Sequence, residues 1–527
     1  MVLSVSGFDL IIKNGIVIDG SGSPLFKADV GVVGDSIRSI GDLSGLSAEK
    51  VIDASGLFVA PGFIDIHNHS DISIFELPTA DNYVLQGVTT VVVGNCGSSP
   101  APLTDINRRE YESMMKSVRP DVAVTWSSFG EYLSSLENLR PSINIATLVG
   151  NGTVRAAVLG YEDIRPSDRD LVVMKDLVRE AMEAGAFGMS SGLRYVPSMF
   201  ADNKEVVELA KVVARYGGFY ATHMRNQGLG LVDSVLESIE VGLESGAGVQ
   251  ISHLKASGRA SWGKTSRALS LISDYASRGY DVSADAYPYE AYSMGLLALL
   301  PPEYRSGSRE EILKKLRNSD VVEKLRKEFT TEINWEDVQI ARSPSNEKLE
   351  GMRVSRVAQE LGIDPVEAVV RLLINDNLAT RIVGFTMNPE EVDEVISHPL
   401  VAIGSDGSVT RLGVGKPHPR SYGTFPRIIA RYVRERRSLS LPEAVRKMTS
   451  LPARKLGVWD RGLIRPGLKA DIVIFDYYAI EDTATYVDPH RYPKGIKHVI
   501  INGRVVVEDG AIDCKQRVGV VLRKTLH

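Results

Sequence analysis

A repeated alternation of short apolar runs with amphipathic segments restricts the fold of this chain more than any other feature. Eight runs in the middle of the sequence are predicted β-strands, at residues 64–66, 89–93, 144–149, 187–190, 218–222, 249–252, 281–284 and 401–404. Most are followed by segments with helical periodicity, such as 170–184 and 203–216. Strands that alternate with helices form parallel sheets. Eight such units therefore predict an α/β fold built on a (β/α)8 TIM-type barrel.

The two ends of the chain have a different pattern, in which short strands alternate with tight turns. Residues 8–19 indicate a strand, a hairpin turn at Asn14-Gly15 and a second strand. Strands and another Asn-Gly turn follow one another in residues 471–507. Because the termini of a domain often lie close together, we expect residues 1–60 and 456–527 to form one small β-sandwich domain.

A long segment separates the seventh predicted strand from the eighth. It contains charged helical segments at 309–316 and 321–329, and a further predicted strand at 381–385 exceeds the eight that a barrel needs. We therefore expect residues 290–380 to form an inserted lid subdomain within a catalytic barrel of residues 61–455.

Composition restricts the class of ligand. The chain has 61 Lys and Arg residues against 66 Asp and Glu, a formal net charge of −5, so a general nucleic-acid footprint is absent. Apolar runs fall short of the roughly 18 residues that a membrane span needs, and the N-terminus lacks the basic start of a secretion signal. Two cysteines, Cys96 and Cys514, suit a reducing compartment. We predict a cytoplasmic protein that acts on a small molecule, with no nucleic-acid or membrane partner.

Side chains that bind metals follow the carboxyl ends of five predicted strands. The set consists of His67, His69, Cys96, His223, His253 and Asp406. His67 and His69 alternate in an extended segment, so both imidazoles point to one side. Cys and His suit Zn²⁺, and a set of this size exceeds one closed tetrahedral site. We expect two metal positions, or one with an open coordination position, and a hydrolytic reaction.

Taken singly, each of these residues also has a purely structural interpretation. A buried histidine more often bonds a backbone carbonyl than a metal. Cys96 fits a small buried apolar position, and Asp406, which precedes a glycine, fits a turn. Their shared position at strand ends is what favours metal binding.

Residues 258–265, GRASWGKT, match the G-x-x-x-x-G-K-[ST] pattern of a phosphate-binding loop between a strand and a helix. A nucleotide-binding protein is therefore an alternative. Against it, the strand ends in His253, the bulky Trp262 lies where a backbone cradle needs small residues, and no later strand offers a persuasive Mg²⁺ ligand.

Together these features resemble the amidohydrolase superfamily, and within it the N-acyl-D-amino-acid deacylases, or D-aminoacylases. The resemblance covers nearly the whole chain. Its motifs include PGFIDIHNHSD at 61–71, GVTTVVVGNCGSSPAP at 87–102, GAFGMSSGLRYVP at 185–197, QISHLK at 250–255, IGSDG at 403–407 and HPRSYGTFPR at 418–427. It implies zinc-dependent hydrolysis of the amide bond of N-acyl-D-amino acids, which releases a carboxylate and a D-amino acid.

The resemblance also implies how the metal residues divide. Most two-metal relatives bridge their ions with a carboxylated lysine on the fourth strand, but GAFGMSSG has no lysine, and the D-aminoacylase branch uses a cysteine instead. The implied tight zinc ligands are Cys96, His223 and His253, and a second, weaker site comprises His67, His69 and Asp406. Zinc lowers the pKa of bound water towards ~7. Asp406 is the implied general base and then general acid, a role worth roughly 10² to 10⁴ in rate.

The free carboxylate of an N-acyl amino acid needs positive or hydroxyl donors beside the metals. Lys255 lies two residues after His253 and so shares its face, although a solvated lysine at a strand end is the structural alternative. The resemblance adds Tyr195, Tyr287 and Ser293 as substrate contacts.

One position departs from the family pattern. Relatives usually have Gly-His-Gly-Thr after the third strand, whereas this chain has Asn151 in place of the histidine. Asparagine can donate a hydrogen bond but does not titrate near neutrality, so we do not expect a proton-transfer role at this position or the same substrate range as in those relatives. A second alternative is another superfamily member that opens cyclic amides, as hydantoinases and dihydroorotases do, and the missing lysine disfavours it.

Overall fold

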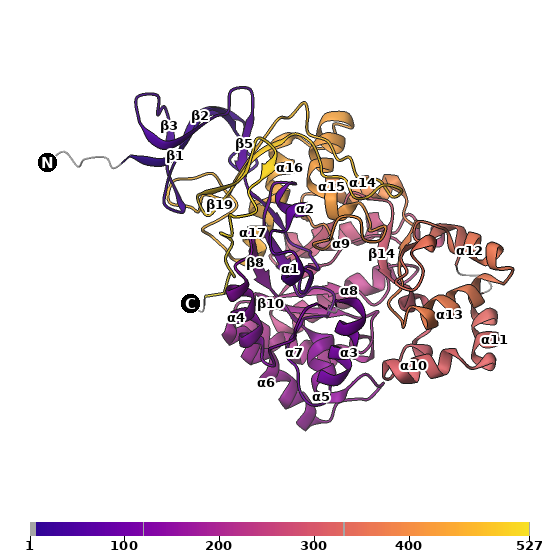
Figure 1. Cartoon of the computed structure of the whole chain (residues 1–527). Coiled ribbons are helices and arrows are strands. Elements are labelled where there is room, and N and C mark those ends of the chain that lie inside the picture. Colours follow the sequence, from indigo (N-terminus) through magenta and orange to yellow (C-terminus); the bar gives the residue numbers. More distant parts are fainter. Residues whose placement is uncertain (1–6, 120, 330–332, 526–527) are drawn as a thin grey trace.

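The computed structural model describes residues 7–119, 121–329 and 333–525 (Figure 1). Residues 1–6 and 526–527 of the expected terminal domain lie outside this range. No helix in the described residues is long and apolar enough to cross a membrane.

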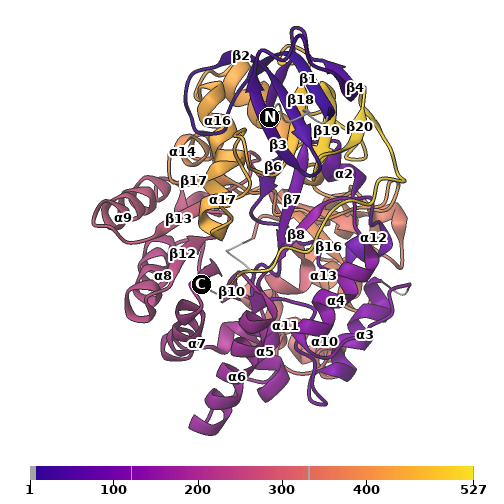
Figure 2. The same cartoon turned by 90° about the vertical axis from the view of Figure 1, so that its left-hand side faces the viewer.

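Parallel strands run through the middle of the molecule (Figure 2). They are β6 (Phe63–Asp65), β7 (Val88–Val93), β8 (Asn144–Thr147), β9 (Val149–Gly150), β10 (Gly188–Gly192), β11 (Phe219–His223), β12 (Gly248–Ile251), β13 (Val282–Ala286) and β17 (Val401–Ile403). One sheet has the order β6-β7-β8 and the other β9-β10-β11-β12-β13-β17. All eight predicted strands are present, and the third is divided at Leu148.

Contacts at the carboxyl ends link the first and the last of these strands. Asn68 and Gly407 form a parallel bridge, and the backbone N–H of Asp406 donates to the carbonyl of His67 at 2.7 Å. These contacts link the two parallel sheets at the carboxyl ends of β6 and β17.

Amphipathic helices follow the strands and cover them, as the periodicity predicts. They include α6 (Asp168–Ala184), α7 (Asn203–Arg215), α8 (Leu231–Ser245) and α9 (Thr265–Ser277). The Ser167 hydroxyl caps the first turn of α6 through the N–H of Asp170, and Gly185, with φ 112°, ends this helix. Met174 and Val178 of α6 lie one turn apart and are buried, and a buried side chain of this size contributes roughly 1.5–3 kcal/mol.

Both ends of the described chain contribute to one nine-stranded sheet. Its strands are β1 (Phe8–Val17), β2 (Phe26–Val33), β3 (Ser36–Gly41), β4 (Ala48–Asp53), β5 (Phe58–Pro61), β18 (Ile472–Phe475), β19 (Ile496–Ile501), β20 (Arg504–Glu508) and β21 (Ala511–Ile512). The antiparallel pair β5 and β18 joins the two ends of the chain. The predicted Asn502-Gly503 turn connects β19 to β20, with positive φ at both residues.

The predicted hairpin turn at Asn14-Gly15 is wrong, because β1 continues through it. Asn14 has φ 61°, and the register with β2 shifts there, so the two residues form a β-bulge. The Asn14 side chain donates to Asp53 at 2.9 Å, and a Cβ on Gly15 would lie 2.5 Å from Val59. Both halves of β1 pair with other strands of the sheet, so the chain bends without reversing.

Residues 290–385 form a separate lobe, seen to the right of the parallel strands in Figure 1. Its elements are β14 (Tyr292–Gly295), α10 (Arg309–Leu316), α11 (Ser319–Glu328), β15 (Val338–Arg342), α12 (Val354–Leu361), α13 (Pro365–Asn375) and β16 (Arg381–Gly384). The strands form an antiparallel sheet of order β14-β16-β15. Leu296, Ile340 and Leu373 are among the fully buried residues of an apolar core that this lobe does not share with the parallel strands.

The C-terminal segment of the described chain runs along β8. The N–H of Ile145 donates to the carbonyl of Val520 at 2.9 Å, and the N–H of Leu522 donates to the carbonyl of Ile145 at 2.8 Å. A Cβ on Gly519 would lie 2.2 Å from the carbonyl oxygen of Ile143, so the close approach requires glycine there.

Candidate metal centre

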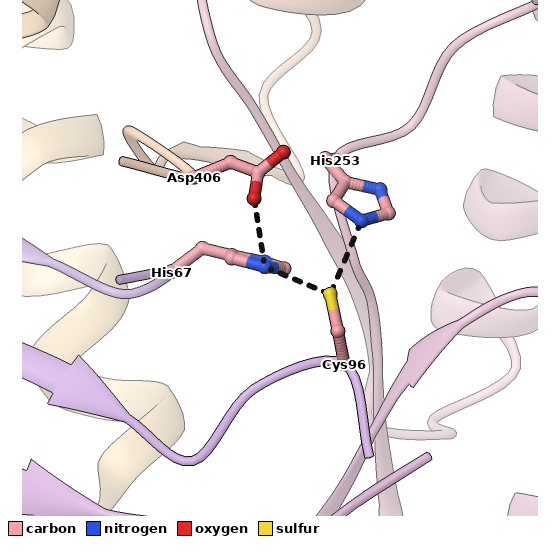
Figure 3. A group of neighbouring side chains, drawn as sticks. All are labelled: His67, Cys96, His253 and Asp406. Carbon is pink, nitrogen blue, oxygen red and sulfur yellow. Dashed lines mark hydrogen bonds and ion pairs between the residues drawn. The ribbon is translucent and has the colours of Figure 1, made fainter. Parts of the chain in front are cut away.

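The six predicted metal-type side chains meet at the carboxyl edge of the parallel strands. Cys96 Sγ lies 3.4 Å from Nε2 of His67, 3.4 Å from Nε2 of His253 and 3.7 Å from Nδ1 of His223. Asp406 is adjacent, and one ligand atom from each of His67, Cys96, His253 and Asp406 lies within 4.8 Å of the others (Figure 3). Parallel strands bring such side chains together because their carboxyl ends share one side of the sheet.

His69 completes the group on the side of the carboxylate. Its Nε2 lies 3.1 Å from Oδ1 of Asp406, and Nε2 of His67 lies 3.7 Å from the same oxygen. The thiol therefore faces three imidazoles, and the carboxylate faces two.

Three of these residues have the left-handed backbone conformation that side chains other than glycine rarely adopt. The φ angles are 54° at Cys96, 36° at His253 and 51° at Asp406. Such conformations cost on the order of 1–3 kcal/mol each and are concentrated at functional sites. Each turns a side chain towards the common centre directly after its strand ends.

Asp285, in β13, bonds the imidazole of His67 and the backbone of His253. Its Oδ1 accepts hydrogen bonds from Nδ1 of His67 at 3.0 Å and from the backbone N–H of His253 at 2.7 Å. Its Oδ2 accepts from Nε2 of Gln250 at 3.0 Å. Nε2 of His67 is thereby turned towards Cys96, as happens when a carboxylate supports a metal-bound histidine. The sequence analysis missed Asp285, although it lies near the end of the seventh strand.

The charges around this group favour the ionised forms of Cys96 and Asp406. Burial would raise the pKa of the Cys96 thiol, but the charges of His67 and His253 outweigh burial and lower this pKa well below its usual range. Burial would also raise the pKa of Asp406, yet Arg420 and the histidines lower it. A thiolate and a carboxylate side by side suit a cation bound between them.

The His223 imidazole fits the same interpretation, whereas Asp285 and Cys96 outweigh burial and raise the pKa of His67 well above its usual value. Burial and the neighbouring His253 lower the pKa of His223 to about 3, which leaves this ring neutral. Its Nε2 is buried and has no hydrogen-bond partner among the described residues. A neutral imidazole beside a thiolate is a donor set that Zn²⁺ prefers, so these residues fit a zinc ion.

A cavity of about 1940 Å³ opens over these residues. Lys255, Tyr195 and Ser293 line it, and so does Arg381 of the inserted lobe. Lys255 Nζ donates to the carbonyl of His253 at 2.8 Å. The Tyr195 ring packs edge-on against the His223 ring, with 4.7 Å between the ring centroids. Burial lowers the pKa of Lys255 to about 8.

Tyr287 is buried beside Lys255. Lys255 Nζ is 5.3 Å from the centroid of its ring, and its buried hydroxyl has no hydrogen-bond partner within the described chain. Arg420 was not predicted from the sequence either. It is a buried arginine whose Nη1 lies 2.8 Å from Oδ2 of Asp406.

Asn151, the departure from the family pattern, is fully buried at the start of α5 (Asn151–Leu159). It accepts a hydrogen bond from the Ser198 hydroxyl and is not among the cavity-lining residues. It therefore supports the loop after β10 and does not face the metal residues.

The segment that resembles a phosphate-binding loop forms hydrogen bonds with a glutamate of this chain. The N–H of Gly263 donates to Oε1 of Glu391 at 2.9 Å, and the Thr265 hydroxyl donates to the same oxygen at 2.6 Å. A carboxylate of this chain thus occupies the start of α9 where a phosphate would bind, which disfavours the nucleotide alternative.

Comparisons with known proteins agree with this geometry. The profile of the amidohydrolase family matches residues 50–247 and 318–507. An N-acyl-D-glutamate deacylase of Alcaligenes xylosoxydans xylosoxydans is 36% identical over 498 residues, which are 94% of this chain and 93% of that protein. A D-aminoacylase of the same organism is 36% identical over 518 residues, 98% of each chain.

A solved structure extends the similarity to three dimensions. The N-acyl-D-glutamate deacylase of Bordetella bronchiseptica, crystallised with zinc and a phosphonate inhibitor, matches with a TM-score of 0.84 and 33% identity. The match covers 98% of this chain and 100% of that one. The chain therefore belongs to the amidohydrolase family, and within it to the branch of the N-acyl-D-amino-acid deacylases. The resemblance found in the sequence motifs is confirmed.

Proposed function

We propose that this protein is a zinc-dependent hydrolase that cleaves the amide bond of N-acyl-D-amino acids and releases a carboxylate and a D-amino acid. The observation that carries the proposal is the position of the Cys96 thiol, within 3.7 Å of nitrogen atoms of His67, His223 and His253 and beside Asp406. Relatives with this activity cover nearly the full chain.

The residues divide into two groups that share the thiol. Cys96, His223 and His253 would hold the tight zinc ion, and His67, His69 and Asp406 would line the second, weaker position. Cys96 Sγ is equally far from His67 and His253, at 3.4 Å, which suits a thiolate that bridges both groups. Bound zinc supplies Lewis-acid polarisation of the amide carbonyl and brings the pKa of water towards ~7.

Asp406 moves the proton in this reaction. Its carboxylate faces the cavity beside His69, accepts a proton from the attacking water and then delivers it to the leaving nitrogen. Lys255, Ser293 and Tyr195 contact the substrate, and Lys255 neutralises its carboxylate. Tyr287, whose ring centroid lies 5.3 Å from Lys255 Nζ, is a further substrate contact.

We further propose that the parallel strands form a closed (β/α)8 barrel, which the bridge between Asn68 and Gly407 supports. On this proposal the barrel comprises residues 61–455, and residues 290–380 act as its lid. Residues 1–60 and 456–527 form the terminal β-sandwich.

The proposed location is the cytoplasm, because two free cysteines suit a cytoplasmic enzyme.

Metal analysis combined with paired assays tests the function. The purified protein is expected to contain at least one zinc ion per chain and to hydrolyse N-acetyl-D-methionine but not its L enantiomer. A hydantoin is assayed in parallel. Ring opening of the hydantoin without hydrolysis of N-acetyl-D-methionine would favour the cyclic-amide alternative and contradict the proposal.

A further inference from the structure

Two arginines of the inserted lobe lie opposite each other in its antiparallel sheet. Arg342 of β15 and Arg381 of β16 are register partners, and both line the cavity over the metal residues. The register shifts just before Arg342, and without this bulge Ala341 would lie opposite Arg381 instead. The sheet therefore places two arginines side by side at the cavity.

Neither guanidinium of this pair has a hydrogen-bond or ion-pair partner among the residues that the structure describes. Acids of the same lobe have other partners, because Oε1 of Glu350 accepts from the backbone N–H of Ser343 at 3.1 Å, and Oδ2 of Asp337 accepts from Asn334 at 3.0 Å. Burial raises the pKa of Glu350, and Arg342 offsets this only in part. Like charges directly opposite each other in a sheet are destabilising, so the pair lacks an anion.

A third arginine adds to the positive charge at this wall. Arg119 follows α3 (Arg108–Val118), lines the same cavity and forms an ion pair with Glu76. Burial lowers the pKa of Arg119, and Arg342 lowers it further. Burial likewise lowers the pKa of Arg381, and Arg119 adds to this effect. Each protonated guanidinium thus disfavours the others, and a bound anion would relieve that cost.

Charges of the metal centre also reach Arg381. After burial, Arg420 lowers the pKa of Arg381 most, while Tyr195 and Asp406 raise it. Arg342 instead acts on the arginine after α3 and on an acid of the lobe. The row of arginines therefore begins beside the reaction centre at Arg381 and continues outwards to Arg342.

We propose that Arg381 and Arg342 form a second anion subsite, which gives the enzyme a preference for N-acyl-D-amino acids that carry a second carboxylate. The inference rests on the deacylase function proposed above and narrows its substrate class. Lys255 neutralises the carboxylate next to the scissile amide, so the arginine pair receives a carboxylate further from that bond. The planar guanidinium fork matches the two oxygens of a carboxylate and binds them in a bidentate manner.

Either half of the substrate could supply the second carboxylate, as an acidic side chain or as a dicarboxylic acyl group. The chemistry that the arginines recognise is the same. Substrates that carry the extra carboxylate in one half only distinguish the two sources. N-acetyl-D-glutamate carries it in the amino acid, with N-acetyl-D-glutamine as its neutral counterpart. N-succinyl-D-methionine carries it in the acyl group, with N-butanoyl-D-methionine as its neutral counterpart.

The experiment compares Arg381→Met, Arg342→Met and Arg356→Met with the parent enzyme on these four substrates. The parent is expected to prefer at least one dicarboxylate over its neutral counterpart by about 10- to 100-fold in kcat/KM. Arg381→Met is expected to abolish this preference by lowering kcat/KM for the dicarboxylate, and Arg342→Met to reduce it. Arg356 is the control, because it is an exposed arginine of the same lobe that pairs with Glu360 at 3.0 Å, and its variant is expected to keep the preference.

A second readout needs no turnover. Since Arg381→Met removes one of two like charges that face each other, its melting temperature is expected to stay constant or to rise. Its zinc content is expected to stay constant as well. A clear fall in the melting temperature of Arg381→Met would show that the arginine stabilises the lobe, and would contradict the unpaired state on which the subsite depends.

Two kinetic outcomes overturn the subsite while the deacylase function stands. One is a parent enzyme that treats each dicarboxylate and its neutral counterpart alike. The other is a preference for a dicarboxylate that survives in Arg381→Met. A parent enzyme that hydrolyses none of the four N-acyl-D-amino acids refutes the deacylase function, and the subsite with it.

Discussion

The candidate metal centre and the inserted lobe share one cavity but are built in different ways. The metal residues come from strands that lie far apart in the sequence, and the parallel sheet and Asp285 hold them in place. The lobe has its own antiparallel sheet and its own apolar core. We therefore expect the reaction chemistry to depend on the sheet edge, and a change in the lobe to alter the shape of the cavity without moving the metal residues.

The largest effect is expected from Cys96→Ala, which removes the thiolate that the two metal groups share. Zinc content is expected to fall and kcat to drop by about 10³-fold or more, because the activated water depends on the metal. Metal analysis and steady-state kinetics measure both. Cys514→Ala is the control, since Cys514 is the other free thiol and is exposed. A Cys96→Ala enzyme with a normal zinc content and a normal rate would show that the thiol is not part of the metal centre.

Asp285→Asn tests whether the orientation of the His67 imidazole is as important as its presence. Asparagine keeps the size but loses the negative charge beside Nδ1 of His67, and zinc affinity is expected to fall by about 10–100-fold. Competition with a chelating dye measures this affinity. Asp281→Asn is the control, because Asp281 lies just before the same strand, at its opposite end, and pairs with Lys455. Equal affinities in the two variants would contradict the orienting role of Asp285.

A smaller effect is expected from Lys255→Met, which keeps the stem but removes the charge from the cavity wall. Loss of a charge-assisted hydrogen bond is expected to raise KM for N-acetyl-D-methionine by about tenfold. The methyl ester of this substrate lacks the carboxylate, so parent and variant are expected to treat it alike. An equal rise in KM for the ester would show that Lys255 does not recognise the carboxylate.

The smallest effect on the reaction is expected from Leu373→Ala, in the core of the lobe. Leu373 is fully buried, and the cavity left behind costs about 2–5 kcal/mol of stability. Hydrogen exchange is expected to rise within residues 290–385 while zinc content stays constant. Leu361→Ala, at a position 52% exposed in the same lobe, is the control. Loss of zinc from Leu373→Ala would show that the two regions are not independent.

The strands and metal residues could be predicted because their signals are local. Apolar runs define buried strands, and the ends of parallel strands meet at one edge whatever their separation in sequence. Asn14 illustrates the limit of such signals. An Asn-Gly pair favours a left-handed backbone, but whether that produces a turn or a bulge depends on the strands that pair on either side.

Other features depend on contacts that no local pattern records. Arg420 pairs with Asp406, which lies fourteen residues earlier and comes close only after folding. The surroundings of Tyr287 are another such feature, because its ring packs against two cations, Lys255 and Arg420. The helices at 309–316 and 321–329 were predicted from periodicity, whereas the sheet that they accompany includes the unexpected strands β14 and β15.

The segment that runs along β8 has a consequence for how the protein is made. Val520 donates to the side chain of Asn144, a residue that precedes it by 376 positions. At a synthesis rate of roughly 5–20 residues per second, the ribosome needs about 20 to 75 seconds to add that length of chain. Throughout this interval the nascent polypeptide lacks the partner of one of its earliest buried strands. The supply of chaperones during translation is therefore expected to influence how much of the polypeptide reaches its native state.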